Sequence, residues 1–252
     1  MKHIKLLYLF LLISWSSLPL QAADYLLQSP NGKLTVEIET KGQLSYTLKH
    51  NSQTLLDKSP IGLLLEDKIL GEDIKISRIK RNSSVKEHIV SPHYRLPSFE
   101  VTYNELNLKF KGNYGIIFRA YNEGIAYRFY TTMKGPLIIK DEMVQMNFPK
   151  DYPTFMSYST MPTGEDQYAM AFQNLYTKSS IKGVDTNNIA FLPITIDCGN
   201  ELKMTLLESD LEDYPGMFIK GDGKNTSLQG TFAHYPSEIK NFPPRAMKRI
   251  TK

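Results

Sequence analysis

Residues Phe118–Phe129 read F-R-A-Y-N-E-G-I-A-Y-R-F, with a polar turn at 122–124 between two runs of aromatic and aliphatic residues. Asn and Gly both tolerate the positive φ of a tight turn, so the stretch predicts two antiparallel strands joined by a hairpin. Arg119 and Arg128 lie within these strands. An arginine in a half-buried strand needs carboxylate or carbonyl oxygens for its five N–H donors. The hairpin is therefore expected to hold charged side chains with defined partners.

The same alternation of apolar and polar residues recurs along most of the chain. Apolar residues occupy every second position in segments 34–38, 44–48 and 106–110, and Gly- and Asn-containing turns separate such segments. A period of two is typical of strands with one buried face. Continuous apolar runs at 61–65 and 189–196 predict central strands buried on both faces. Since no segment sustains a helical period, we predict an all-β fold, a large antiparallel β-sandwich with few helices.

One long segment, Asp151–Asp185, breaks this rhythm. It mixes prolines and a glycine with tyrosines, and its alternation is poor. Loops of this length inside a compact domain usually carry a function or dock on a partner. We therefore expect the segment to be an irregular loop of functional interest.

The N-terminus has the pattern of a secretory signal peptide. Lys2 and Lys5 precede an apolar run that ends at Pro19, and small residues follow at 22–23. This pattern predicts cleavage after Ala22 and a periplasmic or secreted protein, with no membrane attachment after cleavage. An uncleaved membrane anchor is the alternative. The predicted domains are a signal peptide (1–22), a β-sandwich (23–240) and a Pro-rich basic tail (241–252) that is a free end or the start of a connection to another domain.

Composition narrows the classes of function. Removing residues 1–22 from 252 leaves 230 residues, enough for one large domain, and the net charge falls from +4 to +2 because Lys2 and Lys5 leave. The remaining excess of positive charge lies in the tail, at Arg245, Lys248, Arg249 and Lys252, so no nucleic-acid-binding surface is expected. Cys198 follows an apolar run and is expected to be a buried, unreactive thiol. The one tryptophan, Trp15, lies in the signal peptide, which leaves none to stack on a sugar ring.

A second distinctive stretch, Glu208–Met217, reads E-S-D-L-E-D-Y-P-G-M. This stretch and Phe118–Phe129 resemble the N-terminal domain of glycoside hydrolase family 97. So do Ser29–Leu34, Leu56–Leu63 and Leu192-Pro193, and all these segments follow one another in the order found in that family. That family contains the calcium-dependent α-glucosidases and α-galactosidases of Bacteroides-type bacteria. The resemblance covers nearly the whole chain after the signal peptide.

The resemblance implies a super-sandwich of the galactose-mutarotase type, packed against a catalytic (β/α) barrel in the same polypeptide. Glycoside hydrolysis needs two carboxyl groups on opposite sides of the scissile bond. In this family both come from the barrel, and Lys252 lies about where the barrel would begin. The resemblance therefore implies a fragment without catalytic residues or cofactor-binding residues of its own, inactive alone, that scaffolds the barrel and shapes the sugar site.

The resemblance also implies a calcium ion at the site, for which the irregular loop contributes a glutamate in an E-x-x-Y pattern. The matching residues here are Gln173-Asn174-Leu175-Tyr176, with Gln173 at the glutamate position. A glutamine offers one neutral carbonyl oxygen where a glutamate offers a charged carboxylate, so it is a poorer calcium ligand. Calcium binding by this chain is expected to be weakened or lost.

Two groups of charged residues are candidates for contacts with the barrel or with an oligosaccharide: Arg119, Arg128, Glu208, Asp210 and Tyr214. For the arginines, the alternative is an ion pair inside the sandwich with residues such as Glu123 or Asp141, which we favour. For the acids, a structural turn before Pro215-Gly216 is favoured over a metal site.

Two functions thus remain open from the sequence. In the first, the chain is the N-terminal domain of a family 97 α-glucosidase-like enzyme. In the second, it is a free-standing periplasmic protein that binds α-glucans without cleaving them.

Overall fold

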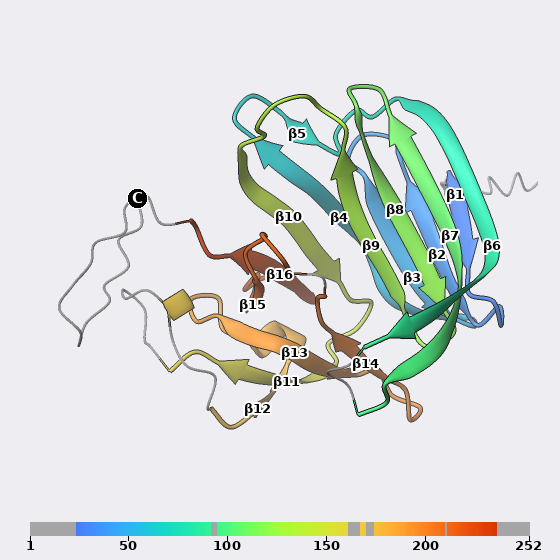
Figure 1. Cartoon of the computed structure of the whole chain (residues 1–252). Coiled ribbons are helices and arrows are strands. Elements are labelled where there is room, and N and C mark those ends of the chain that lie inside the picture. Colours follow the sequence, from blue (N-terminus) through green and yellow to red (C-terminus); the bar gives the residue numbers. More distant parts are fainter. Residues whose placement is uncertain (1–23, 92–94, 161–166, 170–173, 210, 236–252) are drawn as a thin grey trace, which may run out of the picture.

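The computed structural model describes residues 24–91, 95–160, 167–169, 174–209 and 211–235 (Figure 1). In chain order the strands are β1 (Tyr25–Gln28), β2 (Leu34–Glu39), β3 (Ser45–His50), β4 (Gln53–Leu65), β5 (Ile69–Leu70), β6 (Ile76–Val90), β7 (Ser98–Phe110), β8 (Tyr114–Tyr121), β9 (Ile125–Thr131), β10 (Ile139–Asn147), β11 (Pro153–Tyr158), β12 (Thr177–Ser180), β13 (Ala190–Asp197), β14 (Lys203–Leu206), β15 (Met217–Gly221) and β16 (Ser227–Phe232). Two short 3-10 helices, η1 (Gln167–Ala169) and η2 (Ile181–Gly183), complete the described elements.

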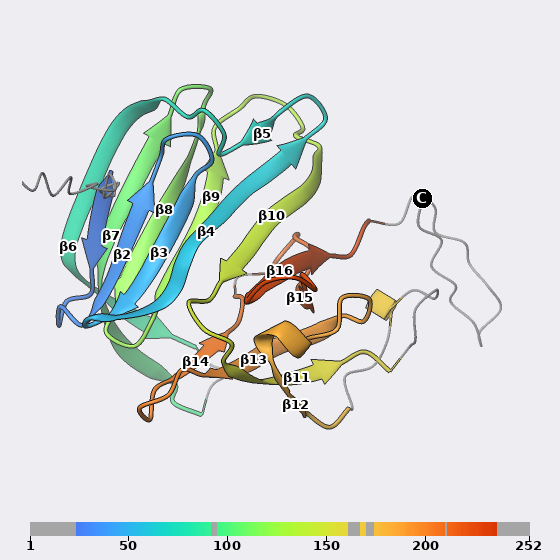
Figure 2. The same ribbon diagram turned by 180° about the vertical axis from the view of Figure 1, so that it is seen from behind.

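The strands form two antiparallel sheets. The larger has the order β1-β2-β3-β4-β10-β16-β15-β13-β11-β12, with β5 paired to β4 and β14 paired to β13. The smaller has the order β6-β7-β8-β9. The smaller sheet lies in front of β2, β3 and β4 in Figure 1 and behind them in Figure 2, while β11–β16 extend to one side. The predicted all-β sandwich is confirmed.

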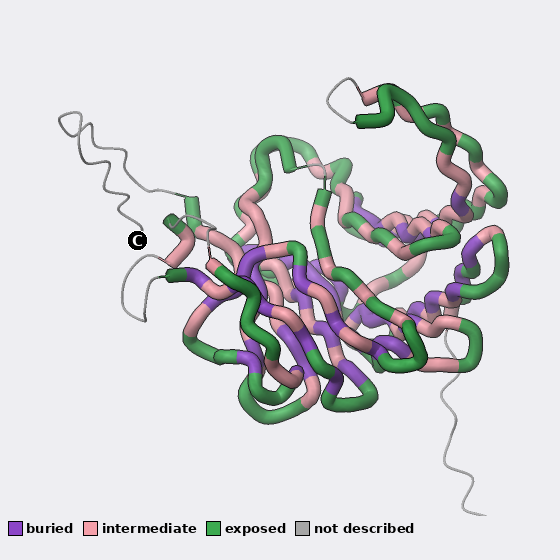
Figure 3. The backbone as a smooth tube through the Cα atoms, turned by 90° about the horizontal axis from the view of Figure 1, so that it is seen from below, coloured by how far each residue is buried: buried purple, intermediate pink, exposed green. Residues whose placement is uncertain are grey.

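The core follows the predicted alternation. The inward side chains of β2 (Val36, Ile38) and of β7 (Leu106, Leu108) are fully buried between the sheets. Phe118 of β8 is also fully buried and lies 6.1 Å from the ring of Tyr46 on β3, which joins the two sheets. Figure 3 shows this as purple segments that alternate with pink and green along the strands. Burial of one face of each sheet is the main stabilising contribution to the sandwich.

Two sequence-based predictions need correction. Neither predicted run is buried on both faces. Leu64 is 39% exposed and points away from the core between Leu63 and Leu65, and Pro193 is exposed within the run 189–196. The segment Asp151–Asp185 is not one irregular loop, since it contains β11, β12 and η2. Its strands were hidden because they are short and lie beside residues with poor alternation.

The turns follow the predicted chemistry. Asn113, with φ of 63°, follows Gly112 in the turn between β7 and β8, a left-handed conformation that asparagine tolerates better than most residues. Asn122, in the turn between β8 and β9, accepts a hydrogen bond on Oδ1 from the backbone N–H of Asn31 at 3.0 Å. The two turns at 29–32 and 122–124 are therefore held together at one end of the sandwich.

The hairpin of β6 and β7 reaches beyond the sandwich. From Arg81 to Glu100 none of the described residues is buried. In Figure 3 these two strands curve away from the rest of the chain as an arm. The side chains of His88 and Glu100 are hydrogen-bonded on the arm, and lysine and arginine side chains lie along its edge strand β6. Charged side chains on an edge strand discourage edge-to-edge pairing with other molecules.

The predicted signal peptide and the tail from 236 lie outside the described residues. Within the part that is described, no helix is long and apolar enough to cross a membrane.

Candidate functional site

The loop between β14 and β15 carries most of the second distinctive stretch. It connects two strands as predicted, but it is longer than a tight turn, and β14 and β15 both pair with β13 and not with each other. Glu208 closes the loop: both its carboxylate oxygens accept from the backbone N–H of Met217, each at 2.9 Å. The carboxylate therefore provides an acceptor for the backbone N–H of Met217 at the start of β15. The predicted structural role of the acidic stretch is supported for Glu208.

Tyr214 connects this loop to strands β10 and β16 of the larger sheet. Its hydroxyl donates to Oε2 of Glu142 on β10 at 2.8 Å, and its ring packs edge-on against Phe232 of β16. Asp210, the other predicted site residue of this stretch, lies outside the described residues. The loop thus spans β10, β15 and β16.

Two carboxyl groups of this region have raised pKa values. Burial raises the pKa of Glu142, the hydrogen bond from Tyr214 lowers it, and the charges of Glu208 and Asp141 raise it. Burial also raises the pKa of Glu208, opposed by the N–H of Met217. A buried carboxylate without a cation beside it favours the protonated form. Glu142 and Glu208 therefore repel each other when both are charged.

Two tyrosines, the buried Tyr46 and the partly buried Tyr127, connect this region to the smaller sheet. Tyr127 on β9 lies 5.7 Å from the rings of both Tyr46 and Phe118. Burial raises the pKa of Tyr127 well above its usual range, and the charges of Tyr46, Glu142 and Tyr214 act in the same direction. Tyr127 therefore stays neutral and serves as packing between the sheets.

The carboxylates of this loop are arranged for structure. Both oxygens of Glu208 bond to one backbone group, and Glu142 accepts from Tyr214. Among the described residues, no three His, Cys, Asp or Glu side chains are grouped so that they could hold a metal ion. The resemblance-based calcium position, Gln173, lies outside the described residues. The described acids alone do not fit a calcium site.

Arg119 sits on the outer face of the smaller sheet and is paired within the domain. Its Nε lies 2.9 Å from Oε2 of Glu105 on β7, and its Nη1 lies 3.8 Å from Oε2 of Glu87 on β6. Its guanidinium also lies 4.3 Å from the centroid of the Tyr103 ring. Burial and the hydrogen bond to Glu87 raise the pKa of Tyr103 to about 12. The predicted ion pair inside the sandwich is confirmed for Arg119, but its partners are Glu105 and Glu87 and not Glu123 or Asp141.

The reason is strand register. Arg119 pairs with Glu105 across β7 and β8, so the two side chains share one face. Glu123 instead lies exposed in the turn, and Asp141 lies on β10 of the other sheet. Arg128 is exposed on β9, opposite Ile117. Contacts of either arginine with a barrel or a sugar stay a prediction.

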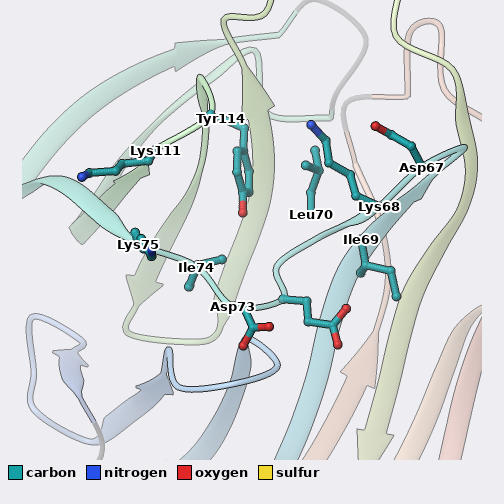
Figure 4. Close-up of a pocket in the computed structure, with 11 residues that line it drawn as sticks. Asp67, Lys68, Ile69, Leu70, Asp73, Ile74, Lys75, Lys111 and Tyr114 are labelled. Atoms are coloured by element: carbon teal, nitrogen blue, oxygen red, sulfur yellow. The ribbon is translucent and has the colours of Figure 1, made fainter.

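A separate depression lies at the opposite edge of the sandwich, between the β4–β6 connection and the β7–β8 turn. It has a volume of about 470 Å³ and a rim of opposite charges, with Asp67, Asp73, Lys75 and Lys111 among its lining residues. Figure 4 shows Tyr114 at its centre. That ring is only 7% exposed and so offers little surface for stacking on a sugar. None of the predicted site residues lines this depression.

Cys198 is buried as predicted, with 3% of its surface exposed. Burial and the charge of Asp197 raise its pKa, so the thiolate needed for a nucleophile is disfavoured. The cysteine is part of the core.

Comparison with known proteins places these features in a family. The family model described as the N-terminal part of glycosyl hydrolase 97 matches residues 27–248. A retaining α-galactosidase from Bacteroides thetaiotaomicron is 35% identical over 239 residues, which cover 92% of this chain and 36% of that enzyme. The chain thus spans little more than a third of this curated relative.

Solved structures agree on the fold. A glycoside hydrolase family 97 enzyme in complex with acarbose, from Pseudoalteromonas sp. strain K8, superposes with a TM-score of 0.69 at 17% identity, covering 82% of this chain and 32% of that one. A β-arabinopyranosidase superposes with a TM-score of 0.73 at 17% identity, covering 84% and 36%. The family model that matches residues 27–248, together with the relative that is 35% identical, shows that this protein belongs to glycoside hydrolase family 97 and corresponds to its N-terminal domain.

Proposed function

We propose that this chain is a non-catalytic sandwich that supports a catalytic barrel and shapes one side of a site for α-glycosides. The observation that carries the proposal is the partial coverage of the relatives: the match covers 36% of the α-galactosidase, so most of that enzyme lies outside the matched part. The intact enzyme would hydrolyse an α-glycosidic bond, and its two catalytic carboxyl groups would belong to the barrel.

The chemistry of the described carboxylates supports this division of labour. Hydrolysis needs an acid and a base or nucleophile that face each other across the bond, about 5–10 Å apart. Glu142 and Glu208, the described acids with raised pKa values, are occupied by Tyr214 and by the backbone of Met217. These hydrogen bonds are made within the loop and to the sheet beside it, as expected of structural carboxylates.

The substrate class follows from the relatives. One is a retaining α-galactosidase and another was solved with acarbose, so we propose a terminal α-galactoside or α-glucoside as the substrate of the intact enzyme. We further propose export to the periplasm by residues 1–22. Any calcium of the intact enzyme would be held chiefly by the barrel, since Gln173 provides only a neutral oxygen.

A domain exchange tests the proposal. Residues 24–252 would replace the matched part of the Bacteroides α-galactosidase, and hydrolysis of 4-nitrophenyl α-galactoside and α-glucoside would be measured. We expect no turnover by this chain alone, little by the truncated galactosidase, and restored turnover by the fusion. Turnover by this chain alone would overturn the proposal, as would a soluble, folded fusion no more active than the truncated enzyme.

The alternative, a free-standing α-glucan-binding protein, is separated by calorimetry. Maltooligosaccharides at millimolar concentration should give no heat of binding with the isolated chain if its role is scaffolding. A saturable heat that disappears on Tyr114→Ala would locate sugar binding at the depression and favour the alternative.

A further inference from the structure

The loop between β14 and β15 presents apolar side chains to solvent. Leu207 is 64% exposed, Leu211 46% and Tyr214 38%. Exposed apolar residues are ordinary when scattered, but clustered ones mark a surface that is covered by something. We name these three residues, together with Glu212, Asp213 and Asp141, the acid loop surface.

The acids around this cluster outnumber the bases. Glu212 and Asp213 are exposed beside Leu211, and Asp141 acts electrostatically on both Glu142 and Tyr214. Lys140, the basic neighbour of Asp141 along the chain, is 3.1 Å from the carboxylate of Glu66. The acid loop surface therefore carries negative charge over an apolar centre.

The described chain ends on this same surface. The hydroxyl of Tyr235 donates to the backbone oxygen of Asp213, and the ring of Phe232 contacts Tyr214. Tyr235, the last described residue, therefore contacts the loop that carries Leu211 and Tyr214.

The composition of residues 236–252 complements this surface. The segment contains five basic residues and one acid, Glu238, and carries four large apolar side chains. These are Ile239, Phe242, Met247 and Ile250. The family match continues to residue 248, which indicates that most of the segment belongs with the domain.

We propose that residues 236–252 turn back over the acid loop surface, with Phe242 and its apolar neighbours covering Leu211 and Tyr214. The basic side chains then face the acids of the loop. Seven residues from 236 to 242 can span up to roughly 23 Å, enough to cross a ten-residue loop. Because the segment is tethered, docking needs less buried area than an interface between separate proteins. This inference does not depend on the proposed function.

A single tryptophan provides the test. A chain without residues 1–22 has no tryptophan, so Phe242→Trp introduces a unique reporter. We expect a blue-shifted emission and a lower acrylamide quenching constant than in the same chain unfolded in urea. Emission and quenching that match the unfolded chain, in a protein whose circular dichroism is native, would overturn the proposal.

Charge exchange makes the test specific. In the Phe242→Trp background, Lys248→Glu with Arg249→Glu should raise the quenching constant, and so should Glu212→Lys with Asp213→Lys. All four changes together should lower it again, and 0.5 M salt should raise it in the parent. Asp213 holds Tyr235 through its backbone oxygen, so its side chain can be changed without breaking that contact.

Lys109→Glu with Lys111→Glu, at the β7–β8 turn, is the matched control and should leave quenching unchanged. A higher quenching constant in this control would refute charge-guided docking. An unchanged quenching constant in both the tail variant and the loop variant would also refute it. Protection that rises with protein concentration between 1 and 100 μM would contradict docking within one chain and assign the surface to a second copy.

Discussion

The two stretches that identify the family differ in how the fold uses them. Phe118–Phe129 lies in β8 and β9, where Phe118 is fully buried and Arg119 has its carboxylate partners on the adjacent strands. Glu208–Met217 lies between β14 and β15 except for Met217, the first residue of β15, and is held by side-chain contacts at Glu208 and Tyr214. The first stretch is stabilised by burial and register, the second by a few polar contacts.

The two regions also differ in whether their charged side chains have partners of opposite charge. On the smaller sheet, each charge of the Arg119 group has an opposite charge beside it, so the group is satisfied within the domain. At the loop, burial raises the pKa values of Glu142 and Glu208, and the charges of Glu208 and Asp141 raise that of Glu142 further. Unbalanced charge at a surface next to exposed apolar residues is what a covering segment or domain would compensate.

The largest expected effect is the loss of a core side chain from the first stretch. Phe118→Ala removes a fully buried ring that contacts Tyr46 and Tyr127, and should lower the free energy of unfolding by about 3–5 kcal/mol. Urea denaturation measures it. Glu123→Ala, in the exposed turn of the same hairpin, should change stability by less than about 0.5 kcal/mol. Equal effects of the two variants would contradict this account of the hairpin.

A smaller effect is expected from the ion pair. Arg119→Ala leaves the Glu105 side chain, 12% exposed, without its close cation and should cost about 1–2 kcal/mol. The figure is below that of a fully buried pair because Arg119 is 32% exposed. Adding Glu105→Gln to Arg119→Met should recover most of the loss, since the less exposed of the two carboxylates beside Arg119 is then neutral. If the double variant is as unstable as Arg119→Ala, the pairing is not what stabilises this face.

The loop should show a weaker effect that depends on pH. The folded pKa values of Glu142 and Glu208 lie above 4.5, so the folded state binds more protons, and stability should fall as the pH rises from 4.5 through those values. Glu142→Gln keeps an acceptor for Tyr214 and removes one charge. It should flatten this dependence and raise stability near pH 7. Chemical denaturation at several pH values measures it, and an unchanged slope would refute the coupling.

The smallest expected effect is that of calcium. Millimolar calcium should shift the melting temperature of the isolated chain no more than the same concentration of magnesium. Gln173→Glu restores the carboxylate implied by the family resemblance and provides the comparison. A calcium-specific rise in melting temperature in the unaltered chain would show a site that the described acids do not predict.

Local sequence patterns were enough to predict the class of the fold. Alternation along 34–38 and 106–110, together with asparagine and glycine at the turns, was sufficient for the sandwich because both signals act within a few residues. The strands β11 and β12 were missed because each is short and lies beside irregular chain. The exposed Leu64 shows that an apolar run does not establish burial on both faces.

The site was harder to predict because its contacts join distant residues. Tyr214 and Glu142 are 72 positions apart, and no periodicity relates them. Arg119 and Glu105 are only 14 apart, yet their pairing depends on the register of β7 and β8. A carboxylate directly opposite an arginine in a predicted hairpin is a signal that could have found the second pair.

By itself, the sequence determined the all-β class, the family and the expectation of a buried, inert Cys198, because these depend on local pattern, motif order and composition. Only the tertiary structure decided that Arg119 pairs with Glu105, that Glu208 closes its own loop, and that Tyr214 bonds to β10. Those contacts follow from strand order and register, which are set by packing of the whole sandwich. Local pattern specifies which residues are buried, and packing specifies which of them meet.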